Sequence, residues 1–398
     1  MRVPEKIRQY LDSQLRDMIR LLEQLVLLES PSLDPSSQKN ILNHLQKEFE
    51  KTNYQVTRVS GRESGGMLLA RPQVRVRSQP LQLLVGHTDT VWPIGTLVKI
   101  PYKENGNQLS GPGIFDMKAG LVQMIFALRT LNFLDLTPSV TPVVFLNSDE
   151  EIGSNDSELW LRRLASRSNR VFVLEPANGE EGRLKTVRSG VGLFKIFLKG
   201  RAAHAGIEPE AGASAIVELS HVIQKLESLN SPHMGISVNV GLVKGGLRPN
   251  VVAQESDASV DVRVLRRQDI ATIQKAIYDL RPNNPAVKID IQGTVSRPPL
   301  EKTPRNKYLW ESALIAAKSL GFDLNESTAG GASDGNTTSS YSATLDGLGG
   351  VGGGAHSEHE FVFANRLPER AALLALLLLQ PPLDQTILEQ GEATNNPP

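Results

Sequence analysis

The stretch TPVVFLNSDEEIGS, residues 141–154, joins an apolar run to three consecutive acids and a glycine. The run TPVVFLN is typical of a buried strand, and Asp149, Glu150 and Glu151 follow it directly. Like charges this close repel one another, so their place at the end of a buried strand requires an explanation.

The same pattern recurs on both sides of this stretch. LQLLVG at 81–86 and VFVLE at 171–175 are typical of strands that are apolar on both faces, and AGLVQMIFALRTL at 119–131 is typical of a helix. Continuous apolar strands that alternate with helices predict an α/β fold, with a central mostly parallel sheet flanked by helices. Apolar residues at helical spacing from Leu11 to Leu25 predict a single amphipathic helix near the N-terminus.

A different pattern begins near residue 188. Residues 188–297 read as strand, helix, strand, strand, helix and strand, which is the split βαβ arrangement of a compact α+β domain. This domain would interrupt a discontinuous first domain made of 1–187 and 298–385. The polar tail 386–398 is expected to be disordered.

Composition excludes several classes of function. Lys and Arg (43) balance Asp and Glu (43), so no net field favours nucleic acid or an anionic membrane. The chain has no cysteine, which removes thiolate catalysis, Cys-ligated zinc and disulfides. The N-terminus is too charged for a secretory signal, and AALLALLLL at 371–379 is too short to span a bilayer. We therefore expect a soluble, cytoplasmic protein.

Acids and histidines follow several of the predicted strands. Taken singly, each has an ordinary explanation: HTD is most often a turn with a capping acid, Asp116 an N-cap, and a strand-end carboxylate a solvated group. Together they would meet at the carboxyl ends of parallel strands, where α/β sheets bind ligands. A glycine-rich segment, GLGGVGGG, precedes one further histidine. The set is His87, Asp89, Asp116, Glu150, Glu151, Glu175 and His356.

Such a cluster of carboxylates is costly unless cations neutralise it. Two histidines and several carboxylates without cysteine suit a pair of divalent metals. Zn²⁺ is the first expectation, and Co²⁺ or Mn²⁺ are alternatives.

The motifs GHTDTV, GPGIFDMKAG, NSDEEIGS, GRAAHAG, RPNVV…DVRV and GAHSEHE occur in this order over most of the chain. In this the chain resembles the two-metal amidohydrolases and metallopeptidases that include glutamate carboxypeptidase, aminoacylase, acetylornithine deacetylase and succinyl-diaminopimelate desuccinylase. It looks most like the glutamate-carboxypeptidase branch. The resemblance implies a catalytic domain, and an inserted lid domain through which two copies form a homodimer.

The resemblance also implies roles for single residues. Glu150 would be the general base, Asp116 the ligand that bridges the two metals, and Asp89 the carboxylate behind a ligating histidine. His359, three residues after His356, competes with it for the place of last ligand, and the preceding glycines favour His356. Asp149 receives no role. The implied metal ligands are His87, Asp116, Glu151, Glu175 and His356.

In the inserted domain, four residues would contact substrate. His204 would reach the active site of the partner subunit, and Asn250 and Arg263 would bind the substrate in the lid. Arg297 would hold a substrate carboxylate, a task that suits the bidentate guanidinium.

The resemblance implies hydrolysis of an amide or peptide bond next to a free carboxylate, in a C-terminal-glutamate peptide or an N-acyl amino acid. Two other functions remain open. GASDG at 331–335 matches a nucleophile elbow, with Ser333, Asp346 and His356 in α/β-hydrolase order. The other alternative is a non-catalytic relative that binds a metal or ligand.

Overall fold

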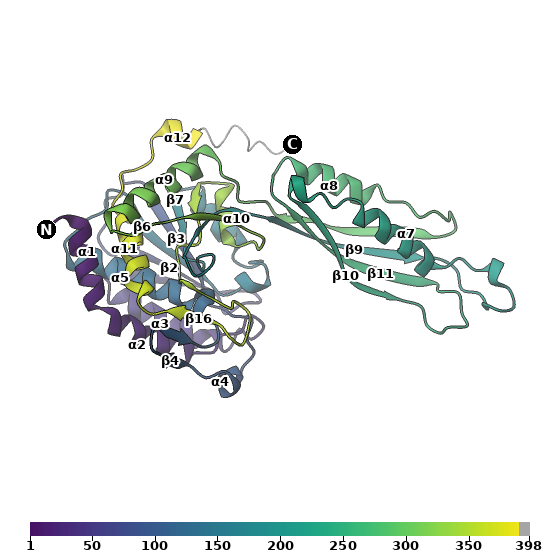
Figure 1. The fold of residues 1–398 in the computed structure, drawn as a ribbon, viewed down its shortest axis with the longest axis horizontal. Helices are drawn as coiled ribbons and strands as arrows, with labels where there is room; N and C mark the ends of the chain where they lie inside the picture. Colours follow the sequence, from purple (N-terminus) through teal and green to yellow (C-terminus); the bar gives the residue numbers. More distant parts are fainter. Residues whose placement is uncertain (390–398) are drawn as a thin grey trace. The chain divides into compact units, whose positions relative to one another are not determined.

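The computed structural model describes residues 1–389, which form two compact units. The first comprises Met1–Thr186, Lys302–Thr328 and the chain from Ser333 onward. The second comprises Val187–Glu301 and the short segment Ala329–Ala332. Figure 1 shows the elements of both units in sequence colours.

The first unit is built on a six-stranded sheet. Strands β6, β3, β7 and β14 pair in parallel, whereas β2 pairs antiparallel to β6, and β1 antiparallel to β2. The expected α/β class with a mostly parallel central sheet is confirmed. The order across the sheet is β1 (Tyr54–Val59), β2 (Met67–Pro72), β6 (Thr141–Asn147), β3 (Leu81–His87), β7 (Ser168–Val173) and β14 (Ala343–Leu345).

Apolar clusters cover both faces of this sheet, which is why its central strands are apolar on both sides. Leu84 of β3 faces the larger cluster, whereas Leu83 and Val85 face a smaller one under α6 (Glu158–Ala165). All seven residues of β6 are buried. The larger cluster contains residues of α1 (Val3–Ser13), α2 (Leu15–Val26), α3 (Gln38–Glu50), α5 (Ala119–Phe133), α9 (Pro304–Ser319) and α11 (Arg366–Leu378).

Shorter elements complete the first unit. A four-stranded sheet has the order β15 (Gly352–Gly353), β16 (Phe361–Phe363), β5 (Gln108–Ser110) and β4 (Lys103–Asn105). β13 (Glu326–Ala329) pairs with β8 (Leu184–Arg188), which leads into the second unit. The short helices are α4 (Thr96–Lys99), α10 (Asp334–Ser339) and α12 (Gln385–Glu389).

Two expectations about the ends of the chain need correction. The predicted N-terminal helix is two helices, α1 and α2, which break at Gln14. The tail expected to be disordered from 386 contains part of α12, while its remainder, 390–398, lies outside the described residues.

The second unit has the expected order of strand, helix, strand, strand, helix and strand. Its antiparallel sheet is β10 (Ile236–Gly245), β11 (Glu255–Val264), β9 (Gly190–Lys199) and β12 (Lys288–Arg297). The two helices, α7 (Ala215–Glu227) and α8 (Asp269–Tyr278), lie on one face of the sheet (Figure 1). Phe194, Ile196 and Leu198 of β9 are buried in the core beneath them, while the residues between face away.

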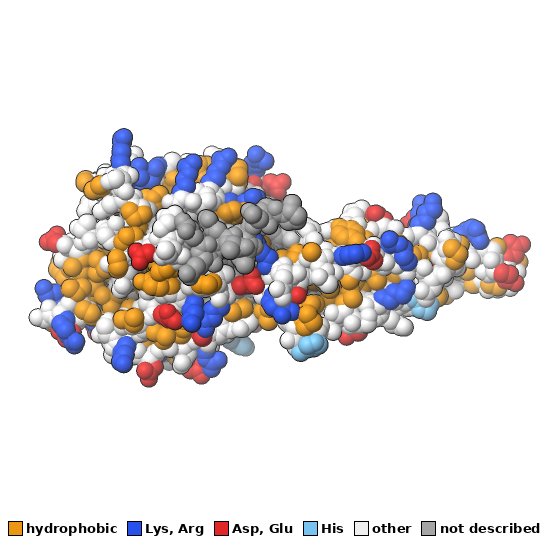
Figure 2. Space-filling model, turned by 90° about the horizontal axis from the view of Figure 1, so that it is seen from above, with side chains coloured by type: hydrophobic (Ala, Val, Ile, Leu, Met, Phe, Trp, Pro, Cys, Tyr) orange, Lys and Arg blue, Asp and Glu red, His pale blue; other side chains and the backbone are white. Residues whose placement is uncertain are grey.

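The surface carries charges of both signs. On the face drawn in Figure 2, acidic and basic side chains are interspersed, as the equal numbers of the two kinds suggest. Within residues 1–389, no helix combines the length and apolarity needed to cross a membrane.

Candidate metal centre

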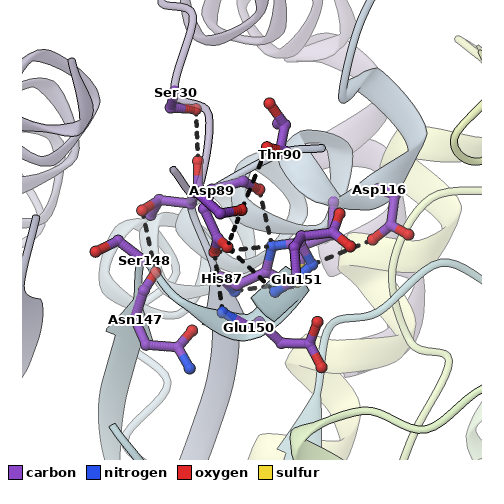
Figure 3. Close-up of polar contacts among 12 residues, drawn as sticks. Ser30, His87, Asp89, Thr90, Asp116, Asn147, Ser148, Glu150 and Glu151 are labelled. Atoms are coloured by element: carbon purple, nitrogen blue, oxygen red, sulfur yellow. Dashed lines mark hydrogen bonds and ion pairs between the residues drawn. The ribbon is translucent and has the colours of Figure 1, made fainter. Parts of the chain in front are cut away.

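His87 is the last residue of β3, and its ring is almost fully buried. On one side, Nδ1 lies 3.0 Å from the backbone oxygen of Asp89 and 3.5 Å from its carboxylate. On the other side, Nε2 lies 3.2 Å from Asp116 Oδ1 (Figure 3). It also lies 3.5 Å from Glu175 Oε1. A ring that donates from Nδ1 to Asp89 turns the lone pair of Nε2 towards the two carboxylates.

Asp89 connects three segments of the chain through hydrogen bonds of its side chain. Its Oδ2 accepts hydrogen bonds from Ser32 Oγ (2.7 Å) and from the backbone N–H of Glu151 (3.1 Å). Its Oδ1 accepts from the N–H of Glu150 at 3.3 Å. Asp89 therefore fixes the turn that carries both glutamates as well as the ring of His87.

Glu150 and Glu151 lie in a single turn of 3₁₀-helix, Glu150–Ile152, directly after β6. Gly153 closes the turn at φ 104°, a conformation that glycine adopts without strain. One oxygen of Glu151 lies 3.1 Å from His356 Nε2, and the other is buried without a hydrogen-bond partner. The Glu150 carboxylate groups instead with His87 and Glu175, with their ligand atoms all within 4.8 Å.

Asp116 reaches the site by another route than expected. It follows no strand of the central sheet and is no N-cap, because α5 begins only at Ala119 and has Lys118 in the N-cap position. It lies in an irregular turn, Ile114–Lys118, between the small sheet and α5. Its carboxylate nevertheless sits between the two histidines, 3.2 Å from His87 and 3.4 Å from His356.

Glu360 holds this turn in place, and sequence reasoning missed it. One of its oxygens accepts from the N–H groups of Phe115 (2.8 Å) and Asp116 (2.9 Å). The other accepts from Gly113 N–H (2.9 Å) and Trp92 Nε1 (3.1 Å). Nothing in the sequence around GAHSEHEFVF distinguishes this acid from a solvated one, because three of its four partners are backbone N–H groups.

His356 and His359 are separated by their contacts. His356 adopts φ 61° after the glycine run, and its half-exposed ring meets Glu151 and Asp116. His359 is exposed and bonds through its backbone N–H to Ser357 Oγ at 3.3 Å. The geometry favours His356 as the residue that joins the acids.

Charged groups of the centre shift one another's pKa values. Burial lowers the pKa of His87, but hydrogen bonds with Asp116, Asp89 and Glu175 outweigh it and raise the pKa well above 6.5. Contacts with Asp116 and Glu151 raise the pKa of His356 to about 10. Burial raises the pKa of Glu151, whereas both histidines hold that of Asp116 well below its usual range.

These residues fit divalent metals. Nitrogen and carboxylate oxygen atoms converge from five separate segments, with the ligand atoms of His87, Asp116 and Glu151 all within 4.8 Å of one another. The buried, unpartnered oxygen of Glu151 is the kind of atom that a cation satisfies. Asp116 is placed between two histidines, as a shared ligand would be.

Comparison with known proteins agrees with this reading. The model of peptidase family M20/M25/M40 matches residues 83–380. The chain belongs to this family. The resemblance inferred from the motifs is thereby confirmed, and the M20 chain is a metal-dependent hydrolase.

Several relatives of this M20 chain are known. It is 27% identical over 370 residues to carboxypeptidase G2 of Pseudomonas sp. (strain RS-16), across 91% of this chain and 88% of that protein. Its fold matches aminopeptidase PepT of Bacillus cereus with a TM-score of 0.75 at 21% identity, covering 92% and 98% of the two chains. It also matches YXEP of Bacillus subtilis, described as a dinuclear metal-binding peptidase of family M20, with a TM-score of 0.68 at 14% identity, covering 95% and 99%.

The four predicted substrate contacts of the second unit of the M20 chain fall into two pairs. Arg263 and Arg297 both lie opposite Val191 of β9, on the two flanking strands and hence on one face of the sheet. Arg263 forms a bidentate pair with Asp261, at 2.7 and 2.9 Å. His204 and Asn250 are exposed beyond the far end of β9, where Ala205 N–H donates to the Asn250 oxygen. Roughly 25 Å of strand separates the pairs.

The serine-hydrolase alternative finds no support in this M20 chain. Ser333 is fully buried and caps α10, accepting from Gly335 N–H at 3.0 Å and donating to Asp346 at 2.6 Å. A nucleophile elbow instead presents its hydroxyl at the open end of the sheet. His356, its supposed partner, contacts Asp116 and Glu151 instead.

Asp149 has a structural place beside the centre. It is buried, and its Oδ2 accepts from the N–H groups of Asp156 (2.7 Å) and Ser157 (3.1 Å). Burial raises its pKa to about 6. Of the three acids after β6, Asp149 is the one whose side chain holds the following loop, through the N–H groups of Asp156 and Ser157.

Proposed function

We propose that this M20 hydrolase cleaves an amide or peptide bond next to a free carboxylate, in a C-terminal-glutamate peptide or an N-acyl amino acid. The observation that carries the proposal is the convergence of His87, Asp116 and Glu151 beside the Glu150 carboxylate. The similarity to carboxypeptidase G2 over most of the chain supports the carboxypeptidase form.

Five residues would hold two divalent ions, with zinc as the first candidate and Co²⁺ or Mn²⁺ as alternatives. Asp116 would be shared, since it faces both histidines. When bound, divalent ions act as Lewis acids towards a carbonyl oxygen and lower the pKa of water. The proposed ligands are His87, Asp116, Glu151, Glu175 and His356.

Glu150 would act as the general base. Its backbone is anchored on Asp89, while its carboxylate lies next to His87 and Glu175 without belonging to the group around Asp116. It would take a proton from the attacking water and deliver that proton to the leaving amine. Asp89 would keep the His87 ring in the tautomer whose Nε2 lone pair faces the centre.

The second unit would serve as lid and dimerisation domain, in the discontinuous arrangement described above. One site for a small substrate cannot contact two pairs of residues that are separated by roughly 25 Å of strand. We therefore assign Arg263 and Arg297 to one active site of a homodimer, and His204 and Asn250 to that of the partner subunit. Light scattering tests the dimer.

The decisive variant is Glu150→Gln. We expect it to keep two metals per chain by elemental analysis and to lose nearly all hydrolysis, because the amide cannot accept the proton. The substrates are a panel of N-acyl amino acids and C-terminal-glutamate peptides, with metal-reconstituted protein. Glu158→Gln, an exposed acid in the next helix, should keep wild-type turnover.

Other outcomes would contradict parts of the proposal. A Glu150→Gln variant with even a tenth of wild-type turnover would overturn the general-base assignment. Metal content without hydrolysis of any substrate would favour a non-catalytic relative. Inactivation by a serine-directed fluorophosphonate, together with full activity in the presence of chelators, would support the alternative of a serine hydrolase with Ser333 as nucleophile.

A further inference from the structure

A small apolar pocket adjoins the metal centre within the first unit. Its volume is about 350 Å³, and its walls are residues 31–34, 90, 91, 93 and 94 together with Glu151 and Ile152. Glu151 is also a proposed metal ligand, so the pocket and the proposed metal site share a residue.

Apolar side chains are unusually exposed there. Leu33 is 86% exposed, Ile94 55% and Val91 43%, and all three line the same pocket. Large apolar side chains gathered at the surface typically mark a binding site. Here the lining shares Glu151 with the proposed metal centre, so part of the substrate is the occupant to consider.

The walls of the pocket are fixed by backbone hydrogen bonds. Ser32 N–H donates to the Thr90 oxygen (3.1 Å), and Thr90 N–H donates to the Ser30 oxygen (2.9 Å). Ser32 Oγ also bonds to Asp89, the residue that positions His87. The pocket is therefore built on the same framework as the metal centre and holds its shape relative to Glu151.

The pocket offers no cationic side chain to an anion. Its lining contains no lysine or arginine, and its two charged residues, Asp34 and Glu151, are both acids. Asp34 is committed to its own turn, where it accepts from Ser36 Oγ at 2.6 Å. A free carboxylate of the substrate would find no Lys or Arg partner in this lining and is better placed elsewhere.

We propose that this pocket receives an uncharged apolar acyl group, or an apolar side chain, on the side of the scissile amide away from the free carboxylate. The inference rests on the proposed function and narrows it: substrates such as N-hexanoyl or N-benzoyl amino acids are preferred over N-acetyl and N-succinyl ones. Ile94 and Leu33 are then residues that determine specificity.

The test compares N-acyl derivatives of one amino acid with metal-loaded enzyme. We expect kcat/KM to rise about threefold to fourfold for each methylene that enters the pocket, from acetyl to hexanoyl. The N-succinyl compound should be at least about tenfold poorer than N-pentanoyl, which has a similar length and no charge.

Substitutions in the lining test whether this pocket causes the preference for long, uncharged acyl groups. Ile94→Asp should bring the hexanoyl-to-acetyl ratio of kcat/KM close to one, and Leu33→Lys should improve the succinyl compound relative to the pentanoyl one. Val98→Asp is the matched control, because Val98 is 88% exposed and outside the lining, so it should leave the ratios unchanged.

A binding measurement separates this inference from the proposed function. Calorimetry with Glu150→Gln should show tighter binding of the N-hexanoyl than of the N-acetyl amino acid, whether or not wild-type enzyme hydrolyses either. Tighter binding of the N-hexanoyl compound, without any turnover by the wild-type enzyme, would support the proposed acyl pocket and overturn only the proposed hydrolytic function. Equal binding of the two, or a preference that survives Ile94→Asp, would overturn the pocket.

Discussion

Glu360 is a buried carboxylate that accepts four hydrogen bonds, from three backbone N–H groups around Asp116 and from Trp92. In Glu360→Gln one acceptor oxygen becomes an NH₂ group that faces donors. We expect metal affinity to fall about 10- to 100-fold, because the turn that presents Asp116 loses its support. A competition titration with a chelating dye measures the change.

Glu358 provides the matched control, since it is exposed and lies two residues earlier. Glu358→Gln should bind metal within about twofold of wild type, as expected of a surface substitution. Wild-type metal affinity in Glu360→Gln would show that the turn holds Asp116 without it.

Single residues also mark the limit of prediction from the sequence. His87, Glu151 and His356 were predictable as a group because histidine and carboxylate side chains carry a recognisable chemistry. Glu360 was not, because its partners are backbone N–H groups of residues more than 240 positions earlier, and backbone donors leave no trace in sequence.

At the scale of elements, α10 shows a buried cap that is open to test. Ser333→Ala removes a hydroxyl that accepts from Gly335 and leaves Asp346 with one donor fewer. We expect a loss of about 1–3 kcal/mol in the free energy of unfolding, with activity on substrate retained. Urea denaturation measures it.

Ser166→Ala serves as the comparison, because Ser166 is exposed at the end of α6. We expect Ser166→Ala to change the free energy of unfolding by no more than about 0.5 kcal/mol. Full loss of hydrolysis in a stably folded Ser333→Ala protein would contradict the capping role.

Elements also differ in how well the sequence predicts them. The strands and α5 were predictable since their apolar runs are long and continuous. The break at Gln14 was not, because Leu11 and Met18 on either side of it are both fully buried in one core, so the helical spacing continues through the turn. The position of Asp116 was mistaken since a Gly-Pro-Gly turn before a helix suggests a cap.

At the scale of the whole molecule, the metals should stabilise the fold. Ligands bind only the folded state, and at a free concentration of 100 times Kd one site contributes about 2.7 kcal/mol. We expect a chelator to lower the Tm of the reconstituted protein and added Zn²⁺ to restore it, as calorimetry would show.

His87→Ala controls for effects of the chelator itself, and its Tm should change little on chelation because the centre has lost a buried ligand. An unchanged Tm in the wild-type protein, with metal removal verified by elemental analysis, would contradict a role of the centre in stability.

The discontinuity of the first unit bears on how the protein is made. β14 completes the central sheet against β7, and Gln82 of β3 donates to the backbone oxygen of Leu378, so this unit is finished only when nearly the whole chain has been synthesised. The strands β9 to β12 are contiguous and emerge earlier. Domains usually fold in the order in which they are synthesised, the N-terminal one first. During synthesis of this chain we expect the reverse: the second unit folds first, and the first unit folds only after β14 and α11 have been made.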